Sequence, residues 1–434
     1  MSLDLLRGLV GHVLSDKDEQ GHEVAGLRDE LAEVPDSYDA LLSFARRLRD
    51  LPLRADWPWV EPSDLDGIQS VAAFPSAVLP AGEVAARIET AFLARVAGCI
   101  LGKPFEFDPT LDELRGVLEP AGEWPLRDYV SLSTNALLRA PQPQWPELVR
   151  EQITHVAEDD DINYTVIAML LLERHGRDFT ADDLRREWLL QLPVLATFGP
   201  ERTQLLAAGL STLLGGSPSA DADLLNPFDE HCGALIRADA YGYACPGDPA
   251  QAASLAHRDA FVTHRRTGVY APMLVAAAIS LALVSSPDDR LGPWSRALEY
   301  VPPQSRFAAI VRDSLAEVSK ATDWLDGYRR IHGRYGAYSH CRVYQEIGTL
   351  LNTSRFAADV GEGICLQVMQ GNDTDSFGAT AGSYLGALLG PSAFDRAHWL
   401  GRFDDTIHLA LAACHIQSLS ELARRMSRLP DRIG

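Results

Sequence analysis

Residues 376–390 read SFGATAGSYLGALLG, in which glycines recur at every fourth position: 378, 382, 386 and 390. The segment is apolar enough to form a buried helix. Each glycine, however, weakens an isolated helix by about 1 kcal/mol relative to alanine. Such a helix is tolerable where a neighbour packs closely against it. We therefore predict that this helix lies at the centre of the protein.

Two acidic stretches, far apart in the sequence, open apolar segments. One is Gly371-Asn372-Asp373-Thr374-Asp375-Ser376, directly before the glycine-rich helix, and the other is Glu158-Asp159-Asp160-Asp161. Capping a helix needs only one carboxylate, which is the plainer reading of either stretch alone. Residues two apart in an extended turn point the same way, so Asp373 and Asp375 can reach one ion. We predict that the two stretches meet and bind hard divalent cations, which would offset the repulsion among their carboxylates.

A further candidate is Glu106, which follows a helix predicted from Gly82 to about Gly102 and stands between Phe105 and Phe107. Apolar neighbours could raise its pKa and make it a general acid, whereas a solvated loop glutamate is the plainer reading. The same helix end superficially resembles a phosphate-binding loop. We reject that reading because the glycine spacing is one residue too short and Pro104 stands where the loop needs Ser or Thr.

Composition excludes several classes of protein. The chain has 434 residues, 46% of them hydrophobic and 23% charged, as in ordinary globular proteins. Its net charge of −21 argues against a nucleic-acid surface. Six cysteines lie scattered without CxxC or zinc spacing, the N-terminus lacks a signal-peptide pattern, and the longest apolar run, 271–284, is too short to span a bilayer. We therefore expect a cytoplasmic protein that does not contact a membrane.

The hydrophobic pattern predicts an all-α fold, because no segment shows sustained two-residue alternation. Residues 1–80 are predicted to form an N-terminal helical extension with a Pro-rich connector, and residues 81–434 the main domain. Within the main domain we expect helices over 356–370 and 407–422, the second capped by Asp404-Asp405-Thr406. Loops are expected at 215–219 and over 327–344, the latter as a surface loop or a lip for a ring-bearing ligand.

From about Gly82 to the C-terminus the chain resembles the ADP-ribosylglycohydrolase family, which includes dinitrogenase-reductase-activating and ADP-ribosyl-arginine/serine hydrolases. Each of its motifs is weak alone, but their order and spacing are specific in combination. The motifs are Gly98-x-x-x-Gly102-x-Pro104-x-Glu106, Asp160-Asp161-x-x-x-Thr165, Gly233-Ala234-x-x-Arg237, His264, and Gly371-x-Asp373-x-Asp375-Ser376.

The resemblance implies a compact orthogonal multi-helix bundle with two Mg²⁺ or Mn²⁺ ions in a central cleft. The metal ligands it implies are Asp159, Asp160, Asp161, Asp373, Asp375 and the hydroxyl of Ser376. Glu106 and Asp161 would be catalytic, and Gly233, Arg237 and His264 would bind substrate. The chain departs from the family pattern at Asp159 and Ile162, which both stand where threonine is usual, and at Cys232, which replaces a common asparagine.

The activity implied is hydrolysis of the glycosidic bond at the distal ribose of an ADP-ribosylated protein or small ADP-ribosyl conjugate, with release of ADP-ribose. The ions would hold the ribose hydroxyls and orient water, and Glu106 would handle the proton. Backbone N–H groups near Gly233, with Arg237 or Arg265, would hold the pyrophosphate. Two alternatives remain open: hydrolysis of another ribosyl or nucleotide compound at the same metal site, and a catalytically silent ADP-ribose-binding relative.

Overall fold

The structure, a computed structural model, describes residues 2–433 apart from 81, 83, 107–108, 136–137, 139–146 and 215–224. The loop expected at 215–219 lies outside the described residues. The described part contains 22 α-helices and one two-stranded antiparallel sheet, so the predicted all-α fold is confirmed. Among the helices that the structure describes, none is long and apolar enough to cross a membrane.

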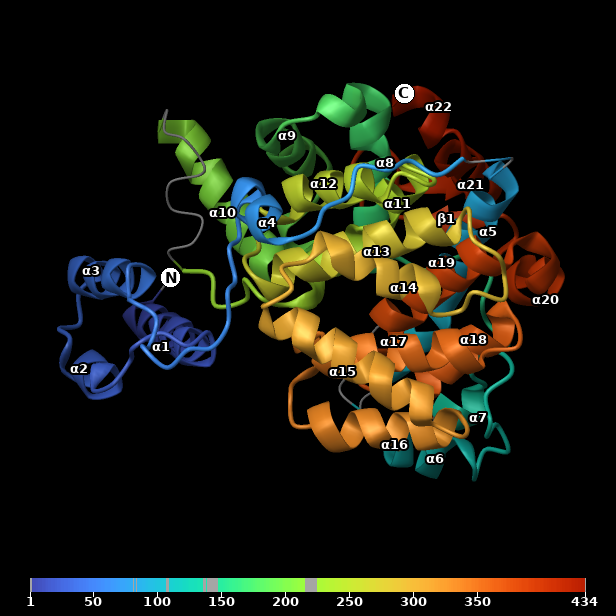
Figure 1. The fold of residues 1–434 in the computed structure, drawn as a ribbon, viewed down its shortest axis with the longest axis horizontal. Coiled ribbons are helices and arrows are strands. Elements are labelled where there is room, and N and C mark those ends of the chain that lie inside the picture. The colour runs from blue at the N-terminus through green and yellow to red at the C-terminus, as the bar shows by residue number, and fades with distance from the viewer. Residues whose placement is uncertain are drawn as a thin grey trace.

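Two helices, α5 (Ala85–Gly102) and α19 (Thr374–Leu389), pack against each other at the centre of the fold (Figure 1). Every residue of α19 is buried. A Cβ atom added to Gly382 would lie 2.2 Å from the carbonyl oxygen of Ala94, and one added to Gly378 would lie 2.6 Å from that of Gly98. The glycines of α19 thus allow the two backbones to touch, and the predicted central position of this helix is confirmed.

The other helices of the main body surround this pair. They include α8 (Asp160–His175), α11 (Asp239–Ala244), α12 (Pro249–Ala260), α13 (Thr267–Ala282), α17 (Tyr344–Phe356), α18 (Val360–Met369), α21 (Leu419–Ser427) and α22 (Leu429–Ile433). The remaining ones are α6 (Leu111–Leu118), α7 (Leu132–Asn135), α9 (Ala181–Gln191), α10 (Gly199–Leu214), α14 (Gly292–Ala297), α15 (Arg306–Lys320), α16 (Trp324–Tyr335) and α20 (Arg396–Leu400).

The N-terminal region forms a small lobe beside this body, seen at one end of the molecule in Figure 1. Helices α1 (Leu3–Glu19), α2 (Leu27–Glu33) and α3 (Tyr38–Arg49) share a hydrophobic core of their own. Helix α4 (Leu65–Val71) instead packs through Ile68 against the main core. The predicted division into residues 1–80 and 81–434 stays a prediction.

Buried polar contacts hold the lobe to the body. The side-chain amide of Gln20 donates to Asp16 and to Asp229 Oδ1, both at 2.6 Å. Arg342 donates to the same Asp16 at 2.9 Å and forms an ion pair with Glu19 at 2.6 Å. Because Asp229 and Arg342 come from two segments of the body, the lobe ties those segments together.

The predicted helix over 407–422 is wrong. Strand β1 (Thr406–His408) pairs with β2 (Ile416–Ser418), and the helix, α21, begins only at Leu419. Ile407, Leu409 and Leu411 are buried while the residues between them are partly exposed, a two-residue alternation typical of a strand. The predicted N-cap at 404–406 is wrong as well, because Ser418 caps α21 by accepting from the Glu421 amide, while Asp405 accepts from the Ser418 hydroxyl and the Ser420 amide.

Two further boundaries differ from the prediction. The expected helix over 356–370 is divided, because α17 ends at Phe356 and α18 begins at Val360, where Asp359 caps it by accepting from the Glu362 amide at 2.8 Å. The expected loop over 327–344 is helical in its first part, since α16 continues to Tyr335. The first helix boundary differs because Asp359 caps a new helix. The segment at 327–335 is helical because Tyr328 and Ile331 are buried, although its composition is typical of a loop.

Candidate functional site

One lysine joins the two acidic stretches. Lys103 Nζ lies 2.7 Å from Asp159 Oδ2, 3.0 Å from Asp375 Oδ2 and 2.8 Å from Glu106 Oε2. Lys103 follows α5 and opens a single 3₁₀ turn, Lys103–Phe105, so the helix end delivers its ammonium to this point. The stretches that the sequence predicted to meet therefore contact one and the same ammonium group.

The first acidic stretch forms the start of α8. Asp159 is the N-cap residue, and its Oδ1 accepts from the Asp161 amide at 2.9 Å. The backbone carbonyl of Asp161 in turn accepts from Arg95, a fully buried side chain of α5 that also pairs with Asp239 at 2.6 Å. Asp160 is half-buried. Arg95 thus fixes the start of α8 against the central helix pair.

The second stretch forms the start of α19. Asn372 has a left-handed backbone, with φ of 60°, which turns the chain into the helix. The thiol of Cys232 donates to Asp373 Oδ2 at 3.5 Å, and the backbone of Ser376 hydrogen-bonds to the Asp375 carboxylate. Asp373, Asp375 and Ser376 are all buried. Cys232 therefore links this stretch to the segment that contains Gly233.

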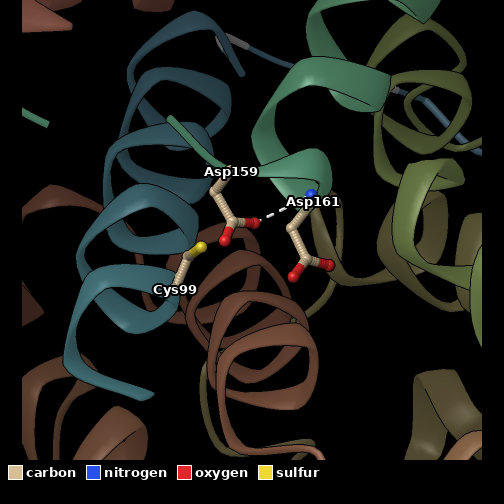
Figure 2. A group of neighbouring side chains, drawn as sticks. All are labelled: Cys99, Asp159 and Asp161. Carbon is tan, nitrogen blue, oxygen red and sulfur yellow. Dashed lines mark hydrogen bonds between the residues drawn. The ribbon is translucent and has the colours of Figure 1, made fainter. Parts of the chain in front are cut away.

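Figure 2 shows a third side chain beside the first stretch. The ligand atoms of Cys99 on α5, Asp159 and Asp161 all lie within 4.8 Å of one another, a spacing that suits a metal ion. Burial raises the pKa of the Cys99 thiol well above its usual value, and Asp159 raises it further. A thiol that stays protonated is a poor ligand, so the carboxylates are the candidate donors in this group.

Lys103, Glu106 and the carboxylates of the two acidic stretches form a cluster that we call the acidic centre. Its charged groups shift one another's pKa values. Burial alone would lower the pKa of Lys103, but Asp159 and Asp375 raise it well above its usual value, so the ammonium is charged. Burial would raise the pKa of Asp375, and Lys103 outweighs this and holds it below its usual value. Burial, followed by the charge of Asp375, raises the pKa of Glu106 to about 7 against the opposing effect of Lys103. Phe107, the second apolar neighbour predicted for Glu106, lies outside the described residues.

The donor set fits a hard divalent cation. Asp161 Oδ1 and Asp375 Oδ1 are buried and have no hydrogen-bond partner among the described residues. Burial raises the pKa of Asp160 and of Asp161, and Asp159 raises both further. Clustered, buried carboxylate oxygens of this kind are the ligands that Mg²⁺ and Mn²⁺ prefer, and a cation would favour their ionised forms.

A cavity of about 610 Å³ opens beside the centre, within the range usual for small-molecule sites. Acidic residues and Lys103 form one wall, and apolar residues form the other. The apolar wall includes Leu195 and Phe198, which are 85% and 59% exposed. A second cavity of about 650 Å³ lies around Trp324 and Trp399, and none of the predicted site residues lines it. We therefore assign the candidate site to the first cavity.

The three predicted substrate-binding residues form a neighbouring group, outside the contacts of Lys103. Arg237 donates to Glu201, Asp259 and the Thr263 hydroxyl, and it is fully buried. The Thr263 hydroxyl also contacts His264 Nδ1 at 2.6 Å, while His264 Nε2 is buried without a hydrogen-bond partner among the described residues. A Cβ at Gly233 would lie 2.6 Å from Glu201 Oε1. In this arrangement the Arg237 guanidinium binds the protein's own carboxylates.

Lys103 is the site residue that the sequence reasoning missed. It appeared there only within the rejected phosphate-loop pattern. The available signal was a lysine directly after the apolar last turns of a helix, residues 96–102, and three residues before Glu106. A lysine that ends a buried helix needs an anionic partner, but the sequence alone does not say which of many acids supplies it.

Comparisons with known proteins concern the family and the fold of the chain. The sequence profile of a family described as ADP-ribosylglycohydrolase matches residues 80–432. A solved structure titled "ADP-ribosylglycohydrolase-related protein complex" aligns with a TM-score of 0.50 at 19% identity, covering 80% of this chain and 99% of that chain. At that identity the likeness shows a shared fold alone. No curated protein sequence matches the chain.

Proposed function

The chain belongs to the ADP-ribosylglycohydrolase family, and on that premise we propose that it is a divalent-metal-dependent glycosidase. Membership makes it an ADP-ribosylglycohydrolase-type hydrolase in general. Our proposal adds the bond and the substrate: the glycosidic bond at the distal ribose of an ADP-ribosylated protein or a small ADP-ribosyl conjugate. ADP-ribose would be the product released.

The observation that supports this proposal most is the meeting of the two acidic stretches around Lys103, beside a cavity. Asp159 and Asp375 lie 2.7 and 3.0 Å from the same ammonium group, although they start two different helices. The cavity of about 610 Å³ next to them has room for a sugar. A site of this kind brings hard ligands and a substrate-sized space together.

The residues we propose as metal ligands are the carboxylates of both stretches and one hydroxyl: Asp159, Asp160, Asp161, Asp373, Asp375 and Ser376. Mg²⁺ and Mn²⁺ suit such oxygen donors. When bound, such an ion supplies Lewis acidity toward water and the ribose hydroxyls. Asp161, buried in the first turn of α8 next to the cavity-lining Asp160, would also stabilise the positive charge that develops on the ribose in the transition state.

Glu106 is the proposed proton donor. Its carboxyl lies 2.8 Å from Lys103 Nζ, and its side chain is 34% exposed, so it borders both the acidic centre and solvent. From this position it would donate a proton to the leaving atom as the glycosidic bond breaks, and then accept a proton from the attacking water. Lys103 would hold the carboxyl in place between these two tasks.

Gly233 and His264 are proposed to contact the ADP-ribose. Gly233 lies in a 3₁₀ turn whose first residue, Cys232, contacts Asp373, so the turn is directly joined to the acidic centre. His264 Nε2 is buried and has no hydrogen-bond partner in the part of the chain that the structure describes, which suits a hydrogen bond to a ligand. For Arg237, which binds Glu201 and Asp259, we propose a supporting role in shaping this turn.

A hydrolysis assay tests the proposal. The chain is incubated with an ADP-ribosylated protein and a panel of free ADP-ribosyl conjugates, with Mg²⁺ or Mn²⁺, and released ADP-ribose is measured. We expect release that stops on chelation and falls at least 100-fold in Glu106→Gln. Glu119→Gln, at an exposed ion pair with Arg115, is the matched control and keeps full activity. Absence of release from every conjugate would contradict the proposal.

A second candidate is hydrolysis of another ribosyl or nucleotide compound. The pairing of Lys103 with Asp159 favours it, because this charged pair borders the cavity at a position where the resemblance led us to expect threonine. The same assay separates the two functions when ribonucleosides and other ribosyl conjugates are added to the panel. Tight ADP-ribose binding by calorimetry without cleavage of any compound would instead favour a silent binding protein.

A further inference from the structure

Lys103 is surrounded by carboxylates, and its ammonium donates a hydrogen bond to Asp375 Oδ2 at 3.0 Å. A lysine ammonium has three N–H donors and no acceptor. Lys103 Nζ has three carboxylates at 2.7 to 3.0 Å, those of Asp159, Glu106 and Asp375, and its side chain is only 11% exposed. These three acids come from three separate segments of the chain. The ammonium is thus held as a metal ion would be held, by oxygens that converge from several elements.

A divalent ion and this ammonium compete for the same oxygens. Mg²⁺ approaches its oxygen ligands to about 2.0–2.1 Å. An ion bound to both Asp159 Oδ2 and Asp375 Oδ2 would therefore lie in the space that Lys103 Nζ fills. The ion and the ammonium would also repel each other in a buried site. Two other carboxylate oxygens, Asp161 Oδ1 and Asp375 Oδ1, are buried and accept no hydrogen bond among the described residues, and Arg95 Nη2 lies 3.7 Å from Asp161 Oδ1.

We propose that the Lys103 ammonium is a built-in cation of this centre, so that the chain binds one divalent ion, through Asp161 and Asp375, instead of two. This inference rests on the proposed metal-dependent function. It replaces the two ions that the resemblance implies with one ion and the Lys103 ammonium. Of the metal ligands proposed above, it assigns Asp159 to Lys103 and not to an ion.

Asp159 balances the charge of Lys103. It stands where the resemblance led us to expect threonine, and it lies 2.7 Å from Lys103 Nζ. Lys103 adds one positive charge to the centre, and Asp159 adds one negative charge. Because the two cancel, the remaining carboxylates keep enough negative charge to bind one divalent ion. Lys103 also pairs with Glu106 at 2.8 Å.

The number of ions per chain tests the inference. Chelator-treated protein is titrated with Mn²⁺ alone by calorimetry, and bound manganese is counted after desalting. We expect one Mn²⁺ per wild-type chain. Lys103→Met, which keeps the length of the side chain and removes its charge, is expected to bind a second Mn²⁺ or to bind its ion at least tenfold more tightly. The control, Lys320→Met, removes an exposed lysine paired with Glu317 and should match the wild type.

Two Mn²⁺ ions per wild-type chain would overturn the inference, and so would a Lys103→Met variant with unchanged stoichiometry and affinity. If that variant does not fold without metal, the wild-type stoichiometry decides alone. The count of bound ions and the hydrolysis assay test the two proposals independently. Wild-type protein that binds one ion and hydrolyses nothing contradicts only the function, and hydrolysis with two bound ions contradicts only the role of Lys103.

Discussion

Gly98 on α5 faces Gly378 on α19 so closely that a Cβ atom on Gly98 would lie 2.1 Å from the Gly378 carbonyl oxygen. The same relation continues to the site, where a Cβ on Gly102 would lie 2.1 Å from the carbonyl oxygen of Thr374. Lys103 follows Gly102, and Asp375 follows Thr374. Close packing of the two backbones therefore sets the separation of the ammonium from the carboxylate.

Gly98→Ala is expected to destabilise the protein. The added methyl group meets backbone, which cannot move aside cheaply, and overpacking of this kind costs about 1–3 kcal/mol. The matched control is Gly116→Ala in α6, where a Cβ atom would meet nothing within 4 Å. There the better helix propensity of alanine should leave the protein as stable or more stable, by up to about 1 kcal/mol. Urea unfolding of both variants checks this, and equal stabilities would contradict it.

Arg237→Met is expected to destabilise the protein by about 3–5 kcal/mol, because it leaves two buried carboxylates, Glu201 and Asp259, without their cation. The control, Arg115→Met, removes an exposed pair with Glu119 and should cost at most about 1 kcal/mol. Thermal unfolding measures both. A stable Arg237→Met variant with a raised KM would instead favour direct contact between Arg237 and substrate.

The pH dependence of the protein's stability tests whether the Glu346 carboxyl is buried as the structure shows. Its carboxyl is buried, one oxygen accepts from Asn372, the other has no hydrogen-bond partner among the described residues, and burial raises its pKa to about 8 from 4.5. A group whose pKa is raised by folding contributes stability below its unfolded pKa, and that stability is lost as the pH rises through 8. Glu346→Gln should therefore gain stability relative to the wild type as the pH increases from 5 to 9. Urea unfolding across this range measures it, and a constant difference would count against the buried carboxyl.

The local sequence was sufficient for the central helix and for the acidic stretches. Glycines at every fourth position predict that another backbone packs closely against this helix. The sequence does not show which segment that is, and the structure identifies it as α5. Asp159–Asp161 and Asp373–Asp375 carry more negative charge than capping needs, which indicates a shared cation without any structure.

The features that were missed depend on contacts between distant segments. The role of Lys103 depends on its ion pairs with Asp159 and Asp375. These residues come close to Lys103 only because α8 and α19 pack against α5. Arg237 was predicted to bind substrate because its motif does not show Glu201 and Asp259, which hold it. The strand at 406–408 pairs with 416–418 nearby in the sequence and bridges to Val156 far away, and its three residues are too few for sustained alternation.

The central claim is that the two acidic stretches bind the same divalent ion, and Mn²⁺ affinity in one variant from each stretch tests it most directly. Asp161→Asn and Asp375→Asn are each expected to bind Mn²⁺ at least tenfold more weakly, a loss of about 1.4 kcal/mol or more, with the fold retained by circular dichroism. Glu119→Gln, at an exposed ion pair with Arg115 outside both stretches, is the control and should bind Mn²⁺ as the wild type does. Wild-type affinity in both Asp161→Asn and Asp375→Asn would contradict the shared centre.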